Sequence, residues 1–232
     1  MRMHVPLDSL ASWKEYLGNS AQWECSKELR YMAQLWWQDE ELPAYVLAMA
    51  ARQPHLQGLK KLFAFPEYRL PLPKGGVPSR SDLYVLACNQ QRELVVMMLE
   101  ATACNAMGPS VQEWLRLKGK TATTEREDVP KAEDDSRTQF LSAQLGLVGQ
   151  SIVHVKYQFL YRTALALLEA ERVGAKQATV WFHCSEEGSL QEYRKFVALY
   201  GVEGEADTLC GPVKVRGVEL FFAWVFFRDC QE

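Results

Sequence analysis

Two carboxylates stand at the ends of two neighbouring apolar runs in this sequence. Asp82 opens the run "DLYVLAC", and Glu100 closes the run "ELVVMMLE". The short polar segment "NQQR" between the runs is typical of a hairpin-like connection, so we expect two adjacent strands. One or two carboxylates and water suffice to bind Mg²⁺, which can polarise a phosphate and help to generate a hydroxide nucleophile. Alternatively, Asp82 caps the turn "PSRS" and Glu100 simply marks a strand end; the spacing leaves both interpretations open.

A second polar set lies in the segment "SIVHVKYQFLYRTALALLEAERV", which predicts the longest helix of the chain, over residues 151–173. His154, Gln158 and Arg162 recur at i, i+4 and i+8, so they would form one polar stripe on a helix that is otherwise apolar. The stripe could face the carboxylates and bind a phosphate or another part of a substrate. The alternative is that it is the solvent-facing side of the helix.

The elements that must position these residues form a mixed pattern. Residues from about 8 to 65 indicate a helical lead-in, with helices over 21–37 and 44–53 and a third short helix in "LQGLKKLFAF". The stretch "FPEYRLPLPKGGVPS" has four prolines and two glycines, which favours an irregular connection into the first of the two strands.

The second half of the chain alternates helices and strands. Residues from about 119 to 136 mix charges of both signs with almost no large apolar side chain, which predicts a mobile surface loop. Helices are expected before the loop in "VQEWLRL" and after it in "TQFLSAQLGL" and "SLQEYRKFVALYG", and strands in "QATVWFHC" and in "VELFFAWVFF" paired with "GPVKVRG". Together, these elements predict a single α/β domain over residues 1–232, with a central mixed sheet of four to six strands flanked by helices.

Composition narrows the possible partners and location. The chain has 26 basic and 29 acidic side chains and a net charge of −3, so any contact with DNA or RNA would need a local basic surface. The six cysteines are scattered and form no CxxC, which argues against a zinc site and favours free thiols in a reducing cytoplasm. The longest apolar run is too short to span a bilayer, and we expect a cytoplasmic protein without a membrane partner.

Three blocks of the sequence carry a resemblance to a known family. The runs "FAFPEYRLPLPKGGVPSRSDLYVLA", "MLEATACNAMGPSVQEWL" and "KYQFLYRTALALLEAERV" resemble a bacterial family in the PD-(D/E)XK superfamily of restriction-endonuclease-like proteins, over residues 10–228. The resemblance implies a core of helix, three-stranded meander, helix and strand. It also implies that Asp82 and Glu100 take the places of the two metal-binding acids, with Mg²⁺ or Mn²⁺ as the cofactor.

The sequence departs from the pattern of this superfamily beside the second acid. The superfamily has a lysine two residues after that acid, and here the place holds Thr102, whose hydroxyl cannot supply a positive charge. The positions that follow, where further acids are typical, hold Ala103, Cys104 and Asn105.

Two other residues could complete the site. Lys156, at the start of the long predicted helix, is a possible substitute for the missing lysine, although a solvated surface lysine is the alternative. Glu28, on the predicted helix where these nucleases often place an extra acid, is a weaker metal-ligand candidate, and its alternative is a solvent-facing glutamate.

These observations leave two hypotheses. The first is a metal-dependent endo- or exonuclease, which the retention of both acids favours. The second is a catalytically inactive nuclease-like domain that binds nucleic acid or a protein partner, which the missing lysine favours. The choice between DNA and RNA and the oligomeric state stay open.

Overall fold

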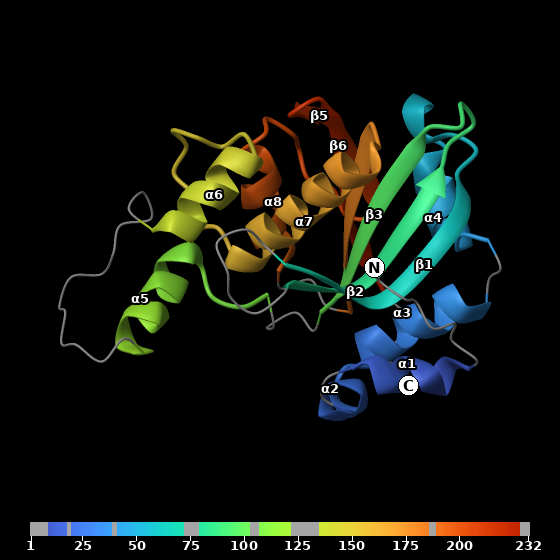
Figure 1. Cartoon of the computed structure of the whole chain (residues 1–232), viewed down its shortest axis with the longest axis horizontal. Coiled ribbons are helices and arrows are strands. Elements are labelled where there is room, and N and C mark those ends of the chain that lie inside the picture. The colour runs from blue at the N-terminus through green and yellow to red at the C-terminus, as the bar shows by residue number, and fades with distance from the viewer. Residues whose placement is uncertain are drawn as a thin grey trace.

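The fold is built around a six-stranded mixed sheet. The computed structural model describes residues 9–17, 20–38, 41–71, 79–102, 107–121, 135–185 and 189–227. The strands follow the order β1-β2-β3-β4-β6-β5 across the sheet (Figure 1). They are β1 Lys60–Leu70, β2 Ser79–Cys88, β3 Leu94–Ala101, β4 Gln177–Cys184, β5 Thr208–Val215 and β6 Val218–Phe226.

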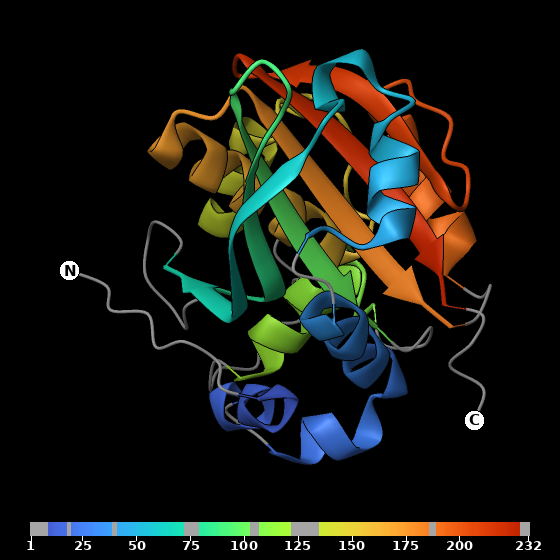
Figure 2. The same cartoon turned by 90° about the vertical axis from the view of Figure 1, so that its right-hand side faces the viewer.

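Helices cover both faces of this sheet (Figure 1 and Figure 2). One layer contains α1 Leu10–Tyr16, α2 Ser20–Cys25, α3 Lys27–Gln38 and α4 Ala44–Ala50, followed by the short 3₁₀ helix η1 Pro54–Leu56. The other contains α5 Val111–Thr121, α6 Ser136–Gln144, α7 Tyr157–Val173 and α8 Leu190–Ala198. Alternation along β3 explains the two cores, because Val96 and Met98 pack with α7 while Met97 and Leu99 pack with the N-terminal helices.

The strand connections match the expected α/β core. Strands β1, β2 and β3 form an antiparallel meander, and α7 leads from the meander to β4, which pairs parallel to β3. Strand β6 extends the sheet parallel to β4, and β5 closes the edge antiparallel to β6, as the pairing of "GPVKVRG" with "VELFFAWVFF" predicted.

The third short helix expected in the lead-in is wrong. Its residues belong largely to β1, an 11-residue strand that pairs with β2 from Lys60 opposite Cys88 to Leu70 opposite Ser79. Pro66 fits within this strand because β1 lies at the edge of the sheet, where a missing N–H costs no ladder hydrogen bond. The helical lead-in therefore ends before Lys60 rather than near residue 65.

Two predicted helices have different bounds from those expected. The helix over 21–37 is divided at Ser26, whose Oγ accepts a hydrogen bond from the N–H of Leu29 at 3.2 Å and so caps α3. The long helix begins at Tyr157 instead of residue 151, because the backbone before it pairs with the start of α5, with the Val111 N–H donating to the Val155 carbonyl at 2.9 Å.

Several other expectations fall on the remaining segments. The predicted mobile loop lies mostly over 122–134, outside the described residues, while its flanks are helical in α5 and α6.

Cys25, Cys88 and Cys210 are free thiols, but Cys184 is disulfide-bonded, so the expectation of free thiols throughout is wrong for that residue. Among the described helices, none combines the length and apolar character needed to cross a bilayer.

Candidate functional site

Asp82 and Glu100 lie opposite each other on adjacent strands. The register pairs Leu83 with Leu99, and one further step along the antiparallel ladder brings Asp82 opposite Glu100. Both point to the α7 face of the sheet, since they follow the alternation of Tyr84 on β2 and of the α7-facing side chains on β3. The two residues are 4% and 5% exposed, so the expected convergence of the two acids occurs in a buried setting.

Each acid already has a strong partner. Asp82 Oδ2 accepts a hydrogen bond from the N–H of Ala101 at 2.9 Å. Glu100 Oε2 lies 2.9 Å from Nη2 of Arg162, which reaches it from α7. Burial opposes the charge of Arg162, but the carboxylates of Glu100 and Asp82 outweigh it and raise the pKa of the guanidinium. Arg162 is therefore a fixed positive charge beside the acids.

A third acid, Glu67, joins this pair from β1. The pairings of Tyr68 with Ser81 and of Pro66 with Leu83 place Glu67 opposite Asp82, so three acids form a row across β1, β2 and β3. Glu67 is 5% exposed, and its backbone has φ 53°, a left-handed conformation that is uncommon for a residue other than glycine. Its Oε2 lies 2.9 Å from Nε of Arg80.

The environment of Glu67 opposes its ionisation. Burial and the nearby Asp82 carboxylate raise the pKa of Glu67 to about 8, although Arg80 and Arg162 act in the opposite direction. Burial also raises the pKa of Glu100 well above its usual range, opposed by Arg162. At neutral pH, Glu67 therefore holds a proton in most molecules.

The charges of the cluster explain these shifts. Three carboxylates and the two guanidinium groups of Arg80 and Arg162 give a formal charge of −1 when all five groups are ionised. In addition, Glu100 Oε1 is buried and has no hydrogen-bond partner among the described residues. A buried excess negative charge is costly unless a proton or a cation compensates for it, and the raised pKa values indicate the proton.

The same contacts decide whether the cluster fits the Mg²⁺ or Mn²⁺ that the resemblance implies. One oxygen of Glu100 is occupied by Arg162, and one oxygen of Asp82 is occupied by a backbone N–H. Within the described ranges, no three His, Cys, Asp or Glu side chains are grouped so that they could hold a metal ion. As arranged, the residues do not fit the ion.

The position of the missing lysine is also buried. Thr102 directly follows β3, is 8% exposed, and donates its N–H to the His183 carbonyl at 2.9 Å.

Lys156, the possible substitute for the lysine, lies elsewhere, and its backbone bridges to Ser110. The hydrogen bonds from Ser110 lower the pKa of Glu113 on α5, and the positive charge of Lys156 lowers it further. The charged side chains that act on Glu100 are Arg162, Asp82 and Glu67. Lys156 is thus placed beside Glu113 rather than at the acids.

The predicted polar stripe does not persist as one surface. His154 is exposed and precedes α7, so it is not part of the helix as expected. Gln158 lies in the first turn of α7 against Gly108, where an added Cβ would be 3.2 Å from Gln158 Nε2. Of the three residues, Arg162 is the one that the structure brings to the acids.

Glu28 is buried rather than solvent-facing, which corrects the alternative given for it above. It is 3% exposed on α3, and its Oε1 accepts a hydrogen bond from Ser185 Oγ at 2.5 Å. Ser185 directly follows β4, so these contacts join the first helical layer to the end of that strand. This gives Glu28 a structural role in linking α3 to the sheet.

Sequence reasoning missed Glu67 and Arg80. The sequence signal that could have identified them was the placement of "FPEYRL" on a strand antiparallel to "RSDLYVLA", which would have aligned Glu67 with Asp82. The prolines in that stretch favoured an irregular segment instead.

Comparison with known proteins gives a family. A family model described as a domain of unknown function, DUF6946, matches residues 6–228. No curated protein and no solved structure matches the chain.

Proposed function

Because the chain belongs to the DUF6946 family, whose description gives no activity, we propose a function from its site. The proposal is a nuclease-like domain that binds nucleic acid and has little or no ability to hydrolyse phosphodiesters. One observation carries it: the neutral, buried Thr102 stands where a cationic group is needed, beside a Glu100 that is already paired with Arg162.

The energetics of the ion pair support weak or absent hydrolysis. A divalent ion at Glu100 would have to compete with Arg162, whose side chain is 13% exposed while that of Glu100 is 6% exposed. Separating a buried pair leaves an uncompensated charge and typically costs about 3–5 kcal/mol. A phosphodiesterase site would also lack the group that stabilises charge on the attacking water, and such a group is commonly worth about a hundredfold in rate.

Binding of nucleic acid rests on the resemblance and on local charge. The net charge of −3 excludes a general attraction to polyanions, so contact must be local. The Arg80 side chain is 27% exposed at the rim of the acid cluster, where it can meet a phosphate while its Nε stays on Glu67.

A cleavage and binding experiment tests this proposal. Wild type, Thr102→Lys and Asp82→Ala are incubated with plasmid and single-stranded substrates in Mg²⁺ or Mn²⁺, and binding of labelled oligonucleotides is followed by fluorescence anisotropy. We expect wild-type cleavage no faster than that of Asp82→Ala, together with salt-dependent binding by both proteins. Brisk wild-type cleavage that Asp82→Ala abolishes would contradict the loss of hydrolysis. Absence of binding to DNA and RNA at low salt would favour a protein partner instead.

A weak metal-dependent nuclease is the second candidate. It is favoured by Glu100 Oε1, which is buried without a partner among the described residues, and by the negative charge that the cluster gains when Glu67 gives up its proton. In that case Thr102→Lys should raise the rate of cleavage by about a hundredfold. If the domain is inactive and only binds, the Thr102→Lys variant should fold normally and still show no cleavage.

A further inference from the structure

Four aromatic rings stack on one another across β1 and β2. The ring centroids of Phe63 and Phe65 are 6.0 Å apart, at an interplanar angle of 15°. Phe65 continues the stack to Tyr84 at 5.8 Å and 14°, and Tyr84 continues it to Tyr68 at 4.5 Å and 30°. Tyr68 and Tyr84 are buried, whereas Phe63 is 58% exposed. The stack therefore ends in a ring that is open to solvent.

The sheet is open at Phe63 because of the place of β1 in the fold. β1 is an edge strand, and α7 packs on β3 and β4 farther inside the sheet (Figure 1). Phe63 pairs opposite Leu86, which packs with the core on the α7 face, and Lys60 pairs opposite Cys88. Because Cys88 and Leu86 are two residues apart, Lys60 lies on the same face as Phe63, roughly 7 Å along the strand. The exposed ring is thus flanked by an exposed lysine.

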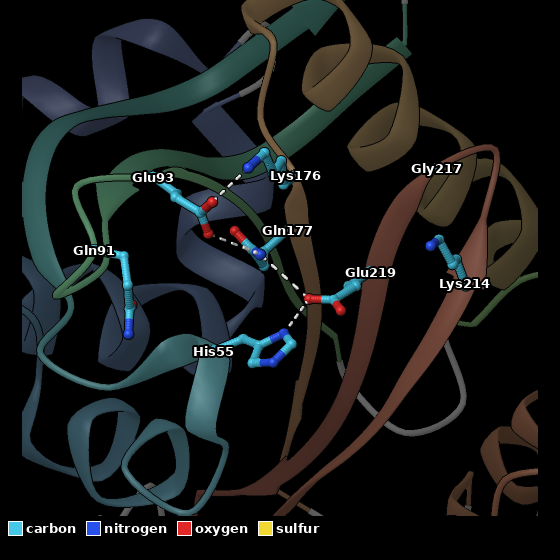
Figure 3. Close-up of a pocket in the computed structure, with 8 residues that line it drawn as sticks. All are labelled: His55, Gln91, Glu93, Lys176, Gln177, Lys214, Gly217 and Glu219. Carbon is cyan, nitrogen blue, oxygen red and sulfur yellow. Dashed lines mark hydrogen bonds and ion pairs between the residues drawn. The ribbon is translucent and has the colours of Figure 1, made fainter.

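Toward β4 and β6, the charges at this end of the sheet cancel one another. Glu93, Lys176, Glu219 and Lys214 line the polar cavity that Figure 3 shows. Glu93 pairs with Lys176 at 2.6 Å, and Glu219 lies opposite Lys214 in the register of β5 and β6. With His55 neutral, the ionised side chains of this cavity contribute no net charge.

Around the open ring, by contrast, positive charge is in excess. Lys60 and Lys61 begin β1, and Arg92 is exposed in the hairpin between β2 and β3. The nearby Arg172 is balanced by the buried Glu169, with which it forms an ion pair at 2.6 Å. The whole chain has a net charge of −3, so the start of β1 is a local basic surface of the kind that contact with a polyanion requires.

We propose that the open end of the aromatic stack binds single-stranded nucleic acid. A nucleobase continues the stack on Phe63, and the neighbouring phosphates lie near Lys60 and Arg92. Every base has a π-face, so such stacking accepts any sequence, while basic side chains follow the backbone. A duplex keeps its base faces within its own stack, and a single strand is therefore the form that fits.

The inference rests on the proposed function and specifies the form of nucleic acid that it takes. Phe63 and Glu67 lie four residues apart on β1, a separation of roughly 13 Å. A strand that contacts Arg80 at the rim of the acid cluster can therefore also reach Phe63.

Binding of labelled oligonucleotides to the full chain, followed by fluorescence anisotropy at low salt, tests the proposal. The probes are dodecathymidylate, dodecauridylate, an abasic DNA chain of the same length and a duplex of the same length. We expect both single strands to bind at least tenfold more tightly than the abasic chain, which keeps the phosphates but has no base to stack. The duplex should bind more weakly than either single strand, and the tighter single strand identifies DNA or RNA as the ligand.

Variants at Phe63 separate stacking from attraction to phosphate. Phe63→Leu keeps an apolar side chain but removes the ring, so it should raise the Kd for the tighter single strand about tenfold and leave the Kd for the abasic chain unchanged. Phe63→Trp keeps a ring and should retain the wild-type affinity. Trp37→Leu, the same kind of change at a 40% exposed residue of α3 in the other helical layer, is the matched control and should change neither Kd.

Photochemical cross-linking locates the contact. A single strand that carries 5-iodouracil should attach on irradiation to the tryptic peptide 62–69, which follows Lys61 and ends at Arg69. Absence of any binding by the wild type would overturn this inference together with the proposed function. Wild-type binding that Phe63→Leu leaves unchanged, or that shows no preference over the abasic chain, would overturn this inference alone. A change in sedimentation with an unchanged Kd in Phe63→Leu would likewise overturn it and would assign the exposed ring to a contact between copies of the chain.

Discussion

Replacement of Glu67 by glutamine should make the protein more stable at neutral pH and should change how its stability depends on pH. Glutamine keeps the shape of a protonated glutamic acid and removes the ionisation. The Glu67 side chain is 1% exposed and has its pKa raised to about 8 by burial and the Asp82 carboxylate, from an ordinary value of 4.5. Between these two pH values the folded protein binds more protons than the unfolded chain, so the free energy of unfolding falls as pH rises.

The size of the effect follows from the pKa difference. Each pH unit in this window costs up to about 1.4 kcal/mol of stability, so at pH 7 the raised pKa costs roughly 3 kcal/mol. Glu67→Gln should remove this contribution and leave the smaller slope of the remaining groups, including Glu100. The stabilisation should vanish near pH 4.5, where the wild-type carboxyl is protonated in most of the folded and about half of the unfolded molecules.

Urea unfolding between pH 5 and pH 8 measures this difference directly. Glu205→Gln, the same chemical change at an exposed position, is the matched control and should follow the wild type across the range. The reasoning would be refuted if Glu67→Gln kept the wild-type slope. A variant that lost stability most strongly at pH 8 would likewise show that Glu67 is ionised there and held by Arg80.

Other substitutions test the contacts around the site, each by urea unfolding with an unchanged m-value. Arg162→Leu should lower the free energy of unfolding by about 3–5 kcal/mol, because it leaves Glu100 buried without its cation; a loss below 1 kcal/mol would contradict the ion pair. Ser26→Ala should cost about 1 kcal/mol through the lost cap of α3, and Ser26→Thr should retain most of the stability. Tyr45→Phe should cost about 1–3 kcal/mol, because it removes both the 2.9 Å hydrogen bond between Tyr45 Oη and His183 Nε2 and the 3.2 Å hydrogen bond that Trp36 Nε1 donates to Tyr45 Oη; an unchanged stability would show that these two bonds contribute nothing net.

The sequence was sufficient to predict the pair of acids because their spacing reflects strand pairing. A short polar connection between two apolar runs forces an antiparallel hairpin, and Asp82 and Glu100 then meet at one end of it. The strands "QATVWFHC" and "VELFFAWVFF" were equally clear, since β-branched and aromatic residues dominate both.

The remainder of the site depends on features that local patterns do not contain. The residues of β1 have the local sequence pattern of a helix followed by a loop. Their strand conformation is fixed by pairing with β2 along the whole length of β1. The left-handed backbone conformation of Glu67 depends on its tertiary environment. Local sequence patterns therefore do not predict that Glu67 lies beside Asp82. His154 was assigned to α7 by periodicity alone, whereas hydrogen bonds to the start of α5 hold its segment outside the helix.

The most direct test of the central claim is anomalous diffraction from crystals grown with Mn²⁺ at neutral pH. The claim is that Arg162 and a proton compensate for the acid cluster, so that no divalent ion joins Asp82 to Glu100. We predict that the anomalous map has no peak within coordination distance of both carboxylates and that Arg162 stays on Glu100. A strong Mn²⁺ peak bridging the two acids, with Arg162 displaced, would contradict the account and favour the metal-dependent nuclease.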